Sequence, residues 1–240
     1  MSTSKARDLC DRNRQPELMD QPGLDEVTHR RALRSLQRIN SFSRSSHLLW
    51  PSIAQVVRCN SDRPVTVLDV ACGAGDVCVA LRAMAAKRGI VLDVTGCDLS
   101  PIAVKHCREL ADKRCVSVQF HQRDAIQDGI PGSYDVVTCS LFLHHLEEEA
   151  AVGLLRQMAA ACNHLVLIND LIRSRLGYQL ARFGCRLLSR SEIVHVDGPR
   201  SVAGAFTCEE ALRLAQQAGM TGVSISKHWP QRFLMRWAKV

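Results

Sequence analysis

The chain has 240 residues, of which 46% are hydrophobic and 23% charged, a balance typical of a soluble globular protein. No apolar run approaches the ~20 residues that a membrane span requires. The N-terminus is polar and lacks the apolar core of a signal peptide, so we expect a cytoplasmic protein. The 11 cysteines include no CxxC pair, which favours reduced, buried thiols over disulfides or a zinc site.

The net charge of +7 lies entirely in residues 171–240, because residues 1–170 carry 20 basic and 20 acidic side chains. A basic segment suits an anionic substrate, a membrane surface or a nucleic acid. Its arginines are spread along the chain and not clustered, so no nucleic-acid partner is expected. A solvated basic face is the simpler interpretation.

Two helices are predicted before any strand, over residues 25–40 and 47–58, where apolar residues recur at helical spacing. Residues 1–22 are charged and interrupted by prolines, which predicts a loose tail. We therefore interpret residues 1–60 as an N-terminal tail followed by a helical cap.

From Val65 onward, apolar runs of strand length alternate with amphipathic stretches of helix length. The five predicted strands cover residues 65–71, 89–98, 115–121, 133–142 and 164–170. This rhythm predicts an α/β fold with a doubly wound, mostly parallel sheet and right-handed crossovers.

After the fifth strand, residues 171–190 are basic and partly amphipathic, and residues 195–206 are rich in turn-forming residues. A capping box then begins a further helix, and two apolar runs near the C-terminus predict an antiparallel pair of strands. We expect one domain over residues 61–240, with residues 171–206 inserted on the substrate side.

The stretch VLDVACGAGD, residues 67–76, ends a predicted strand in a loop with two glycines, Gly73 and Gly75. A dinucleotide-binding loop has the pattern GxGxxG, but Cys78 stands at the third glycine position. No GKS or GKT is present, which excludes a Walker loop. Asp69 and Asp76 add carboxylates, which repel phosphate and favour a cationic ligand.

Two more acids follow the next two predicted strands. Asp98 can accept hydrogen bonds from both ribose hydroxyls, in dinucleotide and adenosyl cofactors alike. Asp124 can accept the amino group of an adenine ring. Together with the acids near the glycine loop, they describe an adenosine with a cationic, phosphate-free arm, which fits S-adenosylmethionine.

In their order and spacing, VLDVACGAGD, GCDLSP, RDA and YDVVTCSLFLHHL resemble the successive motifs of class I S-adenosylmethionine-dependent methyltransferases, over about residues 65–170. Outer stretches such as DGPRSVAGAFT are similar to small-molecule members near the bacterial ubiquinone and menaquinone methyltransferases. The resemblance implies a Rossmann-like sheet of seven strands with the last strand antiparallel, and S-adenosylmethionine as cofactor.

The same resemblance implies which residues bind this cofactor. Those residues are Asp69, Ala71, Gly73, Gly75, Asp98, Leu99, Asp124, Ala125 and Ser140. The loop residues would lie under the methionine end, Asp98 would hold the ribose, and Leu99 would lie against the adenine. Asp124 and Ala125 would meet the adenine edge, and Ser140 would line the pocket near the sulfonium. In the cap, Asn40 and Arg44 would close over the methionine carboxylate.

Three residues are candidates for general base: His144 and His145 after the fourth strand, and Asp170 after the fifth. A neutral imidazole could take a proton from a phenol or an enol. The alternatives are that the histidines only shape the pocket and that Asp170 caps a helix. His145 and Glu148 supply only two metal ligands, so no metal site is expected.

We therefore expect methyl transfer to a small apolar acceptor, at a phenol, quinol or polyketide-like hydroxyl. One alternative is C-methylation of a quinone precursor, and a second is a nicotinamide oxidoreductase. A third is a non-catalytic binding module or peripheral membrane contact, suggested by arginines that alternate with apolar residues between Arg175 and Leu187. The acceptor and the oligomeric state are not predicted.

Overall fold

A computed structural model describes residues 9–18, 27, 28, 30, 31, 33, 35, 44–60, 62–189 and 191–239. Most of the predicted helix over residues 25–40, including Asn40, lies outside this part of the chain. The second predicted helix of the cap is present as α2 (Ser45–Cys59).

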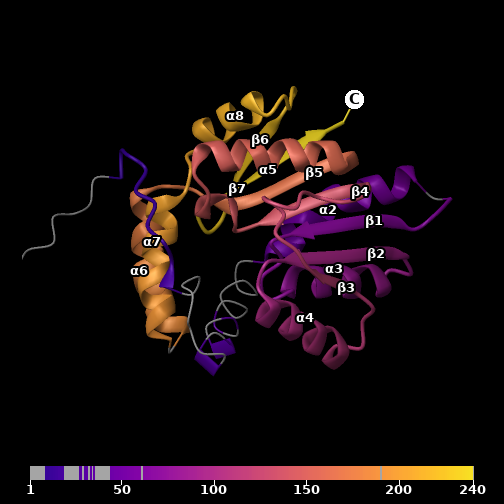
Figure 1. Cartoon of the computed structure of the whole chain (residues 1–240), viewed down its shortest axis with the longest axis horizontal. Coiled ribbons are helices and arrows are strands. Elements are labelled where there is room, and N and C mark those ends of the chain that lie inside the picture. Colours follow the sequence, from indigo (N-terminus) through magenta and orange to yellow (C-terminus); the bar gives the residue numbers. More distant parts are fainter. Residues whose placement is uncertain are drawn as a thin grey trace, which may run out of the picture.

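Seven strands form one sheet in the order β3-β2-β1-β4-β5-β7-β6 (Figure 1). The first five strands run parallel, and β7 is antiparallel to both β5 and β6. The strands are β1 (Val65–Val70), β2 (Leu92–Asp98), β3 (Gln119–Gln122), β4 (Tyr134–Ser140), β5 (Cys162–Leu171), β6 (Ser224–His228) and β7 (Arg232–Ala238). The predicted α/β, doubly wound, mostly parallel sheet is confirmed.

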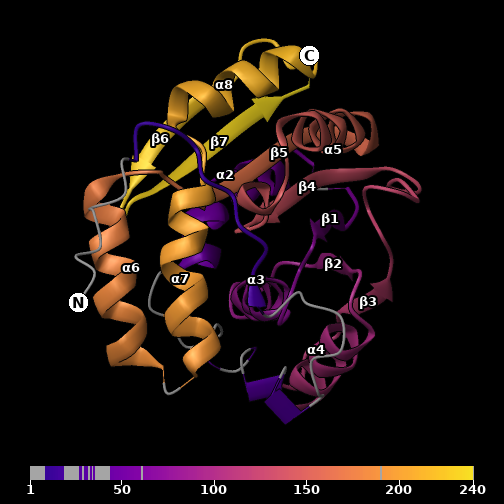
Figure 2. The ribbon, with the colours of Figure 1, turned by 60° about the vertical axis from the view of Figure 1, so that its left-hand side comes forward.

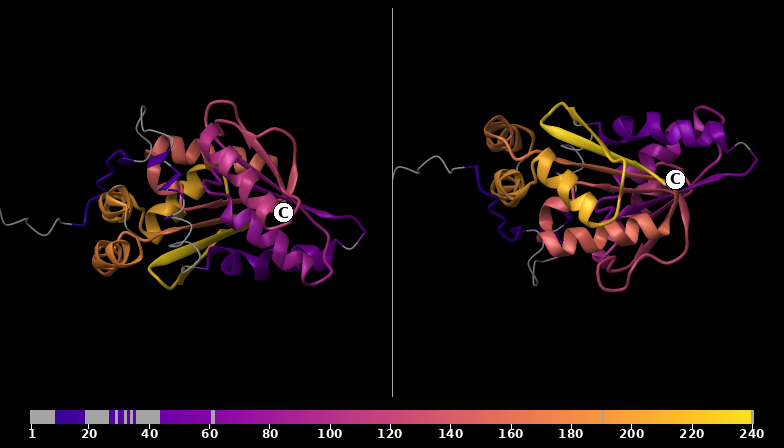
Figure 3. Two further views of the ribbon diagram at one scale, coloured as in Figure 1. Left: turned by 90° about the horizontal axis from the view of Figure 1, so that it is seen from below. Right: turned by 90° about the horizontal axis from the view of Figure 1, so that it is seen from above.

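Helices cover both faces of this sheet (Figure 3). On one face, α2, α3 (Asp76–Ala86) and α4 (Pro101–Lys113) enclose one apolar core. On the other face, α5 (Glu148–Ala161) and α8 (Cys208–Gln217) enclose a second one. Because both faces are covered, the central strands are apolar almost throughout, as in parallel sheets generally. The order in which successive strands join the sheet reverses between β1 and β4, and ligands of such sheets bind beyond the carboxyl ends of the strands at that point.

The inserted segment is a pair of helices, α6 (Arg175–Leu188) and α7 (Glu192–Gly204), which lie side by side (Figure 2). The prediction of turns over residues 195–206 is wrong, because its glycines serve packing and not turning. A Cβ added to Gly198 would lie 2.4 Å from the Sγ of Cys185 on α6. Gly198 therefore permits close contact of the two helices, and the helix also accommodates Pro199.

Asp135 ties the start of β1 to β4 at the amino end of the sheet. Its fully buried carboxylate accepts hydrogen bonds from both Nη atoms of Arg63, at 2.6 and 2.7 Å, and from the backbone N–H of Thr66 at 2.9 Å. Burial by itself would raise the pKa of Asp135, but Arg63 and Thr66 outweigh it and lower that pKa to about 2.

We expect Asp135→Ala to leave the Thr66 N–H and Arg63 without their acceptor, a loss of about 2 kcal/mol. In a chain of this length the melting temperature at neutral pH should fall by roughly 4–8 °C. Because the folded-state pKa of Asp135 lies below the ordinary value of about 3.9, its contribution is present above that pH and is lost as the pH falls towards about 2.

Calorimetry of the wild type and the variant across this pH range checks both statements. The gap between the two melting temperatures should narrow as the pH falls. As a control, Asp112→Ala, at an exposed position of α4, should melt at the same temperature as the wild type. A gap that stays constant down to about pH 2 would contradict the assignment of the stabilisation to ionised Asp135.

Candidate functional site

The glycine loop follows β1 and lies at the carboxyl ends of the strands. Ala71, Gly73 and Gly75 all have left-handed backbones, with φ of +52°, +54° and +73°. A Cβ added to Gly73 would meet nothing within 4 Å, whereas one added to Gly75 would lie 2.7 Å from the Sγ of Cys107. Gly75 therefore packs the loop against α4, and Gly73 leaves the space above the loop open to a ligand.

Asp69 supports this loop from beneath. Its buried carboxylate accepts hydrogen bonds from Thr138 Oγ1 at 2.7 Å and from Cys78 Sγ at 3.4 Å. Burial raises the pKa of Asp69 to about 7, although both hydrogen bonds act in the opposite direction. Asp69 thus connects β1 to β4 and α3, and its carboxylate does not face the open side of the loop.

Asp98, at the end of β2, joins the glycine loop to the turn before α4. Its carboxylate accepts the backbone N–H of Gly73 at 2.8 Å and that of Ser100 at 2.9 Å. A carboxylate has about four lone-pair positions, so ribose hydroxyls can bind beside these two donors. The next side chain, Leu99, is 62% exposed, which leaves an apolar surface where an adenine ring would lie.

Asp124 and Ala125 follow β3. The Oδ1 of Asp124 accepts the N–H groups of Ile126 and Gln127, at 2.9 and 3.1 Å, so this aspartate shapes its own turn. Ala125 is buried, so only its backbone could meet an adenine edge. Arg44, from the cap, begins α2 with a left-handed backbone.

Beyond the loop, three buried side chains carry polar atoms that have no hydrogen-bond partner within the described structure. These atoms are Ser140 Oγ, both amide atoms of Asn169 and Arg232 Nε. Ser140 pairs with Asn169, Asn169 with Leu234, and Leu171 with Arg232, so the three side chains share one face of the sheet.

Leaving buried polar atoms unsatisfied costs about 1–3 kcal/mol each, so this group points to a polar ligand. The methionine end of S-adenosylmethionine carries an ammonium and a carboxylate, which Asn169, Ser140 and Arg232 are suited to hold. The open space over Gly73 and the exposed Leu99 suit the rest of that cofactor, so the residues present fit it. Arg232 was not predicted from the sequence, where the only signal is an arginine at the start of an apolar strand.

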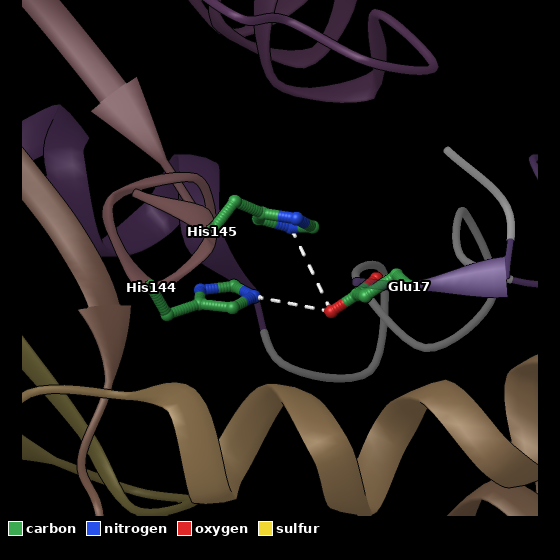
Figure 4. A group of neighbouring side chains, drawn as sticks. All are labelled: Glu17, His144 and His145. Carbon is green, nitrogen blue, oxygen red and sulfur yellow. Dashed lines mark ion pairs between the residues drawn. The ribbon is translucent and has the colours of Figure 1, made fainter. Parts of the chain in front are cut away.

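His144 and His145 lie in the short 3₁₀ helix η2 (Leu143–His145), directly after β4. Asp170, at the end of β5, lies 2.6 Å from His144 Nδ1 and also accepts the backbone N–H of His144 at 3.1 Å. The Nε2 atoms of His144 and His145 lie 3.7 and 3.8 Å from Glu17 Oε1 (Figure 4). The three predicted catalytic residues therefore form one cluster, completed by Glu17.

The charges of this cluster depend on one another. Burial alone would lower the pKa of His144, but Asp170 and Glu17 outweigh it and raise that pKa to about 10. Burial alone would raise the pKa of Glu17, but hydrogen bonding by His144 and the charges of both histidines lower it to about 2. Both ring nitrogens of His144 thus face carboxylates, which leaves this histidine poorly placed to accept a proton from an acceptor.

Glu17 belongs to residues 9–18, which the sequence predicts to be a loose tail. In the structure this segment runs beside α7 (Figure 2) and is anchored mainly by Arg12. Arg12 donates to the carbonyls of Gly204, His144 and Leu146, at 2.6, 3.0 and 2.6 Å. The prediction is wrong for this segment, because its contacts join residues more than a hundred positions apart.

Comparison with known proteins finds methyltransferases. Residues 67–164 match the model of a methyltransferase domain. Over 165 residues the chain is 36% identical to the ubiquinone biosynthesis O-methyltransferase of Methylococcus capsulatus, a match that covers 64% of this chain and 62% of that protein. With the demethylmenaquinone methyltransferase of Thermus thermophilus it is 31% identical over 107 residues, covering 44% and 47%. The matches thus span less than two thirds of these relatives.

Solved structures share the fold at low sequence identity. The plantazolicin methyltransferase BpumL, in complex with a substrate analogue and S-adenosylhomocysteine (SAH), superposes with a TM-score of 0.62 at 15% identity, covering 89% of this chain and 96% of that one. Magnesium protoporphyrin IX methyltransferase from Synechocystis PCC 6803 with bound SAH gives 0.57 at 16% identity, covering 84% and 87%. Residues 67–164 thus form a methyltransferase domain, and the chain shares the fold of S-adenosylmethionine-dependent methyltransferases.

Proposed function

We propose that this chain transfers a methyl group from S-adenosylmethionine to a hydroxyl oxygen of a small, largely apolar acceptor, such as a phenol or quinol. Two observations carry the cofactor assignment: the open space over Gly73, whose N–H donates to Asp98, and the buried polar atoms Ser140 Oγ, Arg232 Nε and the amide of Asn169, which have no hydrogen-bond partner among the described residues. The relatives named O-methyltransferases support oxygen as the acceptor atom over the carbon of a quinone precursor.

In this proposal the protein acts mainly by positioning. S-adenosylmethionine, when bound, supplies an electrophilic methyl group on a sulfonium. Asp98 orients the ribose, and Arg232 and Asn169 hold the methionine end. Alignment of the acceptor oxygen with the methyl carbon then provides most of the rate enhancement. Excluding water also helps, because charge on the sulfur is neutralised during transfer.

His144, His145 and Asp170 are proposed to act together at the acceptor side of the site. None of them faces the site as an isolated base, because His144 lies between Asp170 and Glu17, and the Nε2 of His145 faces Glu17. We therefore assign to this cluster the binding of the acceptor end, and not proton abstraction by a single histidine.

A second proposal concerns α6, which exposes two adjacent strips. One is apolar and includes Leu176, Phe183 and Leu187, which are 53%, 65% and 86% exposed. The other is basic and comprises Arg175, Arg182 and Arg186. No helix within the described residues is long and apolar enough to cross a membrane. We propose that α6 lies on an anionic membrane surface, with its apolar strip in the interface and its arginines at the headgroups.

The cofactor assignment predicts that Asp98→Ala weakens SAH binding by at least about 100-fold. The variant loses the ribose contacts, at about 1.5 kcal/mol or more for each hydrogen bond to a charged group, and releases the Gly73 N–H. Isothermal titration calorimetry measures this, with Asp93→Ala, exposed on the same strand, as a control that binds like the wild type. Equal SAH affinities of the wild type and Asp98→Ala would contradict the assignment of the cofactor site.

The membrane proposal predicts that the protein sediments with vesicles of phosphatidylglycerol and phosphatidylcholine at low salt and is released at high salt. Phe183→Ser combined with Leu187→Ser should lower the bound fraction at least about tenfold, because each apolar side chain contributes roughly 1.5–3 kcal/mol when buried. Val91→Ser, at an exposed apolar residue just before β2 and at the amino ends of the parallel strands, is the matched control. Vesicle binding that the double variant leaves unchanged would refute a role for α6.

A further inference from the structure

We propose that Glu17, His144 and His145 form a binding site for one divalent transition-metal ion, with Zn²⁺ as the ion that best suits these donors (Figure 4). One ligand atom from each side chain lies within 4.8 Å of the other two. Glu17 comes from the N-terminal segment and the two histidines come from η2, so the site would join two distant parts of the chain.

The spacing of the three atoms suits a tetrahedral ion. Two ligand atoms bound at about 2.0–2.2 Å to tetrahedral Zn²⁺ are about 3.3–3.6 Å apart. Glu17 Oε1 lies 3.7 Å from His144 Nε2 and 3.8 Å from His145 Nε2, so each of these two pairs needs to close by only a few tenths of an ångström. Two imidazoles and one carboxylate are also the protein donors of zinc sites that keep one position open.

The side chains that contact the proposed ligands, Asp170 and Ser201, are arranged as in known metal sites. A histidine ligand usually donates its second ring N–H to a carboxylate, which fixes the tautomer and directs the other nitrogen at the metal. His144 has this arrangement, because its Nδ1 lies 2.6 Å from Asp170 Oδ1 while its Nε2 faces Glu17. Glu17 is oriented in turn by Ser201, whose Oγ donates to Oε1.

The charges of the cluster are also compatible with a cation at this position. Glu17 and Asp170 are 8% and 1% exposed, and buried carboxylates are stable only when paired or bound to a metal. Two arginines line the adjoining cavity, but both have acidic partners: Arg14 contacts Glu147 at 2.6 Å, and Arg200 lies 3.9 Å from Asp197.

The sequence predicts no metal site, because His145 and Glu148 alone supply two ligands. Glu148 instead lies on α5 and pairs with Arg213 at 3.0 Å. The third ligand comes from a segment that no local spacing connects to the histidines, and Arg12 holds that segment in place by donating to the carbonyls of His144 and Leu146.

The ion would also account for loss of the acceptor proton, and this step rests on the proposed function. The cluster borders a cavity of about 130 Å³ between the N-terminal segment and α7, towards which the fourth coordination position would open. A hydroxyl bound to Zn²⁺ has a lowered pKa and releases its proton to solvent. Its oxygen then bonds to the methyl carbon as the carbon–sulfur bond breaks, and the bonding electron pair stays on sulfur.

Cobalt titration of the full chain tests the site without any acceptor. After removal of bound metal with a chelator, Co²⁺ should bind at about one ion per chain and show the intense visible bands of a four- or five-coordinate site. Zn²⁺ should displace it. Glu17→Gln and His145→Gln should each weaken binding at least about 100-fold, and Asp170→Asn about 10–100-fold. Glu149→Gln and His164→Gln, which change an exposed acid and an exposed histidine outside the cluster, should bind like the wild type.

Melting temperature and SAH affinity, measured on the same samples, show whether each variant is folded. Absence of the visible bands in the folded wild type, or equal Co²⁺ affinity in folded Glu17→Gln and His145→Gln, would overturn the metal site and leave the proposed function standing if SAH still binds. Loss of the bands in these variants with SAH affinity unchanged would establish the site. A wild type that binds Co²⁺ but not SAH would support the metal site and refute the methyltransferase activity.

Discussion

The glycine loop after β1 and the turn after β2 together form the cofactor edge of this protein. This edge depends on the carboxylate of Asp98. By accepting the N–H groups of Gly73 and Ser100, it connects the loop after β1 to the turn after β2. Both connections lie at the carboxyl ends of parallel strands, where the sheet order brings β1 between β2 and β4. The glycine loop contains three residues with left-handed backbones. Two carboxylates stabilise it: Asp98 accepts the N–H of Gly73, and Asp69, at the end of β1, accepts the hydroxyl of Thr138 on β4.

The site has two parts of different character. The cofactor edge is built from strand ends and short loops, and its open space is due to the missing side chain of Gly73. The proposed acceptor side is built from segments far apart in the chain, because residues 9–18 lie along α7 and bring Glu17 to the two histidines. Arg173 strengthens this arrangement, since it donates to the carbonyls of Leu9 and Cys10 and pairs with Glu210 at 2.6 Å.

The sequence predicts the fold well, and it points to the position of the cofactor, because both signals are local. Alternating apolar runs predict the strands, and a two-glycine loop followed by Asp98 at the next strand end predicts the cofactor position. The prediction of turns in place of α7 is wrong because a glycine usually indicates a turn, whereas Gly198 permits close contact with Cys185 on α6. Glu17 and Arg232 were missed for a different reason: their importance arises from tertiary contacts, with η2 in one case and with Ser45 on α2 in the other.

The central claim is that the glycine loop binds an adenosyl cofactor and not a dinucleotide. A thermal shift with SAH, S-adenosylmethionine and NADH tests it most directly. A ligand present at about 100 times its dissociation constant stabilises the folded state by about 2.7 kcal/mol, which is roughly 5–10 °C for a chain of this length. We expect that shift with both adenosyl ligands and none with NADH. A shift with NADH, or no shift with either adenosyl ligand, would contradict it.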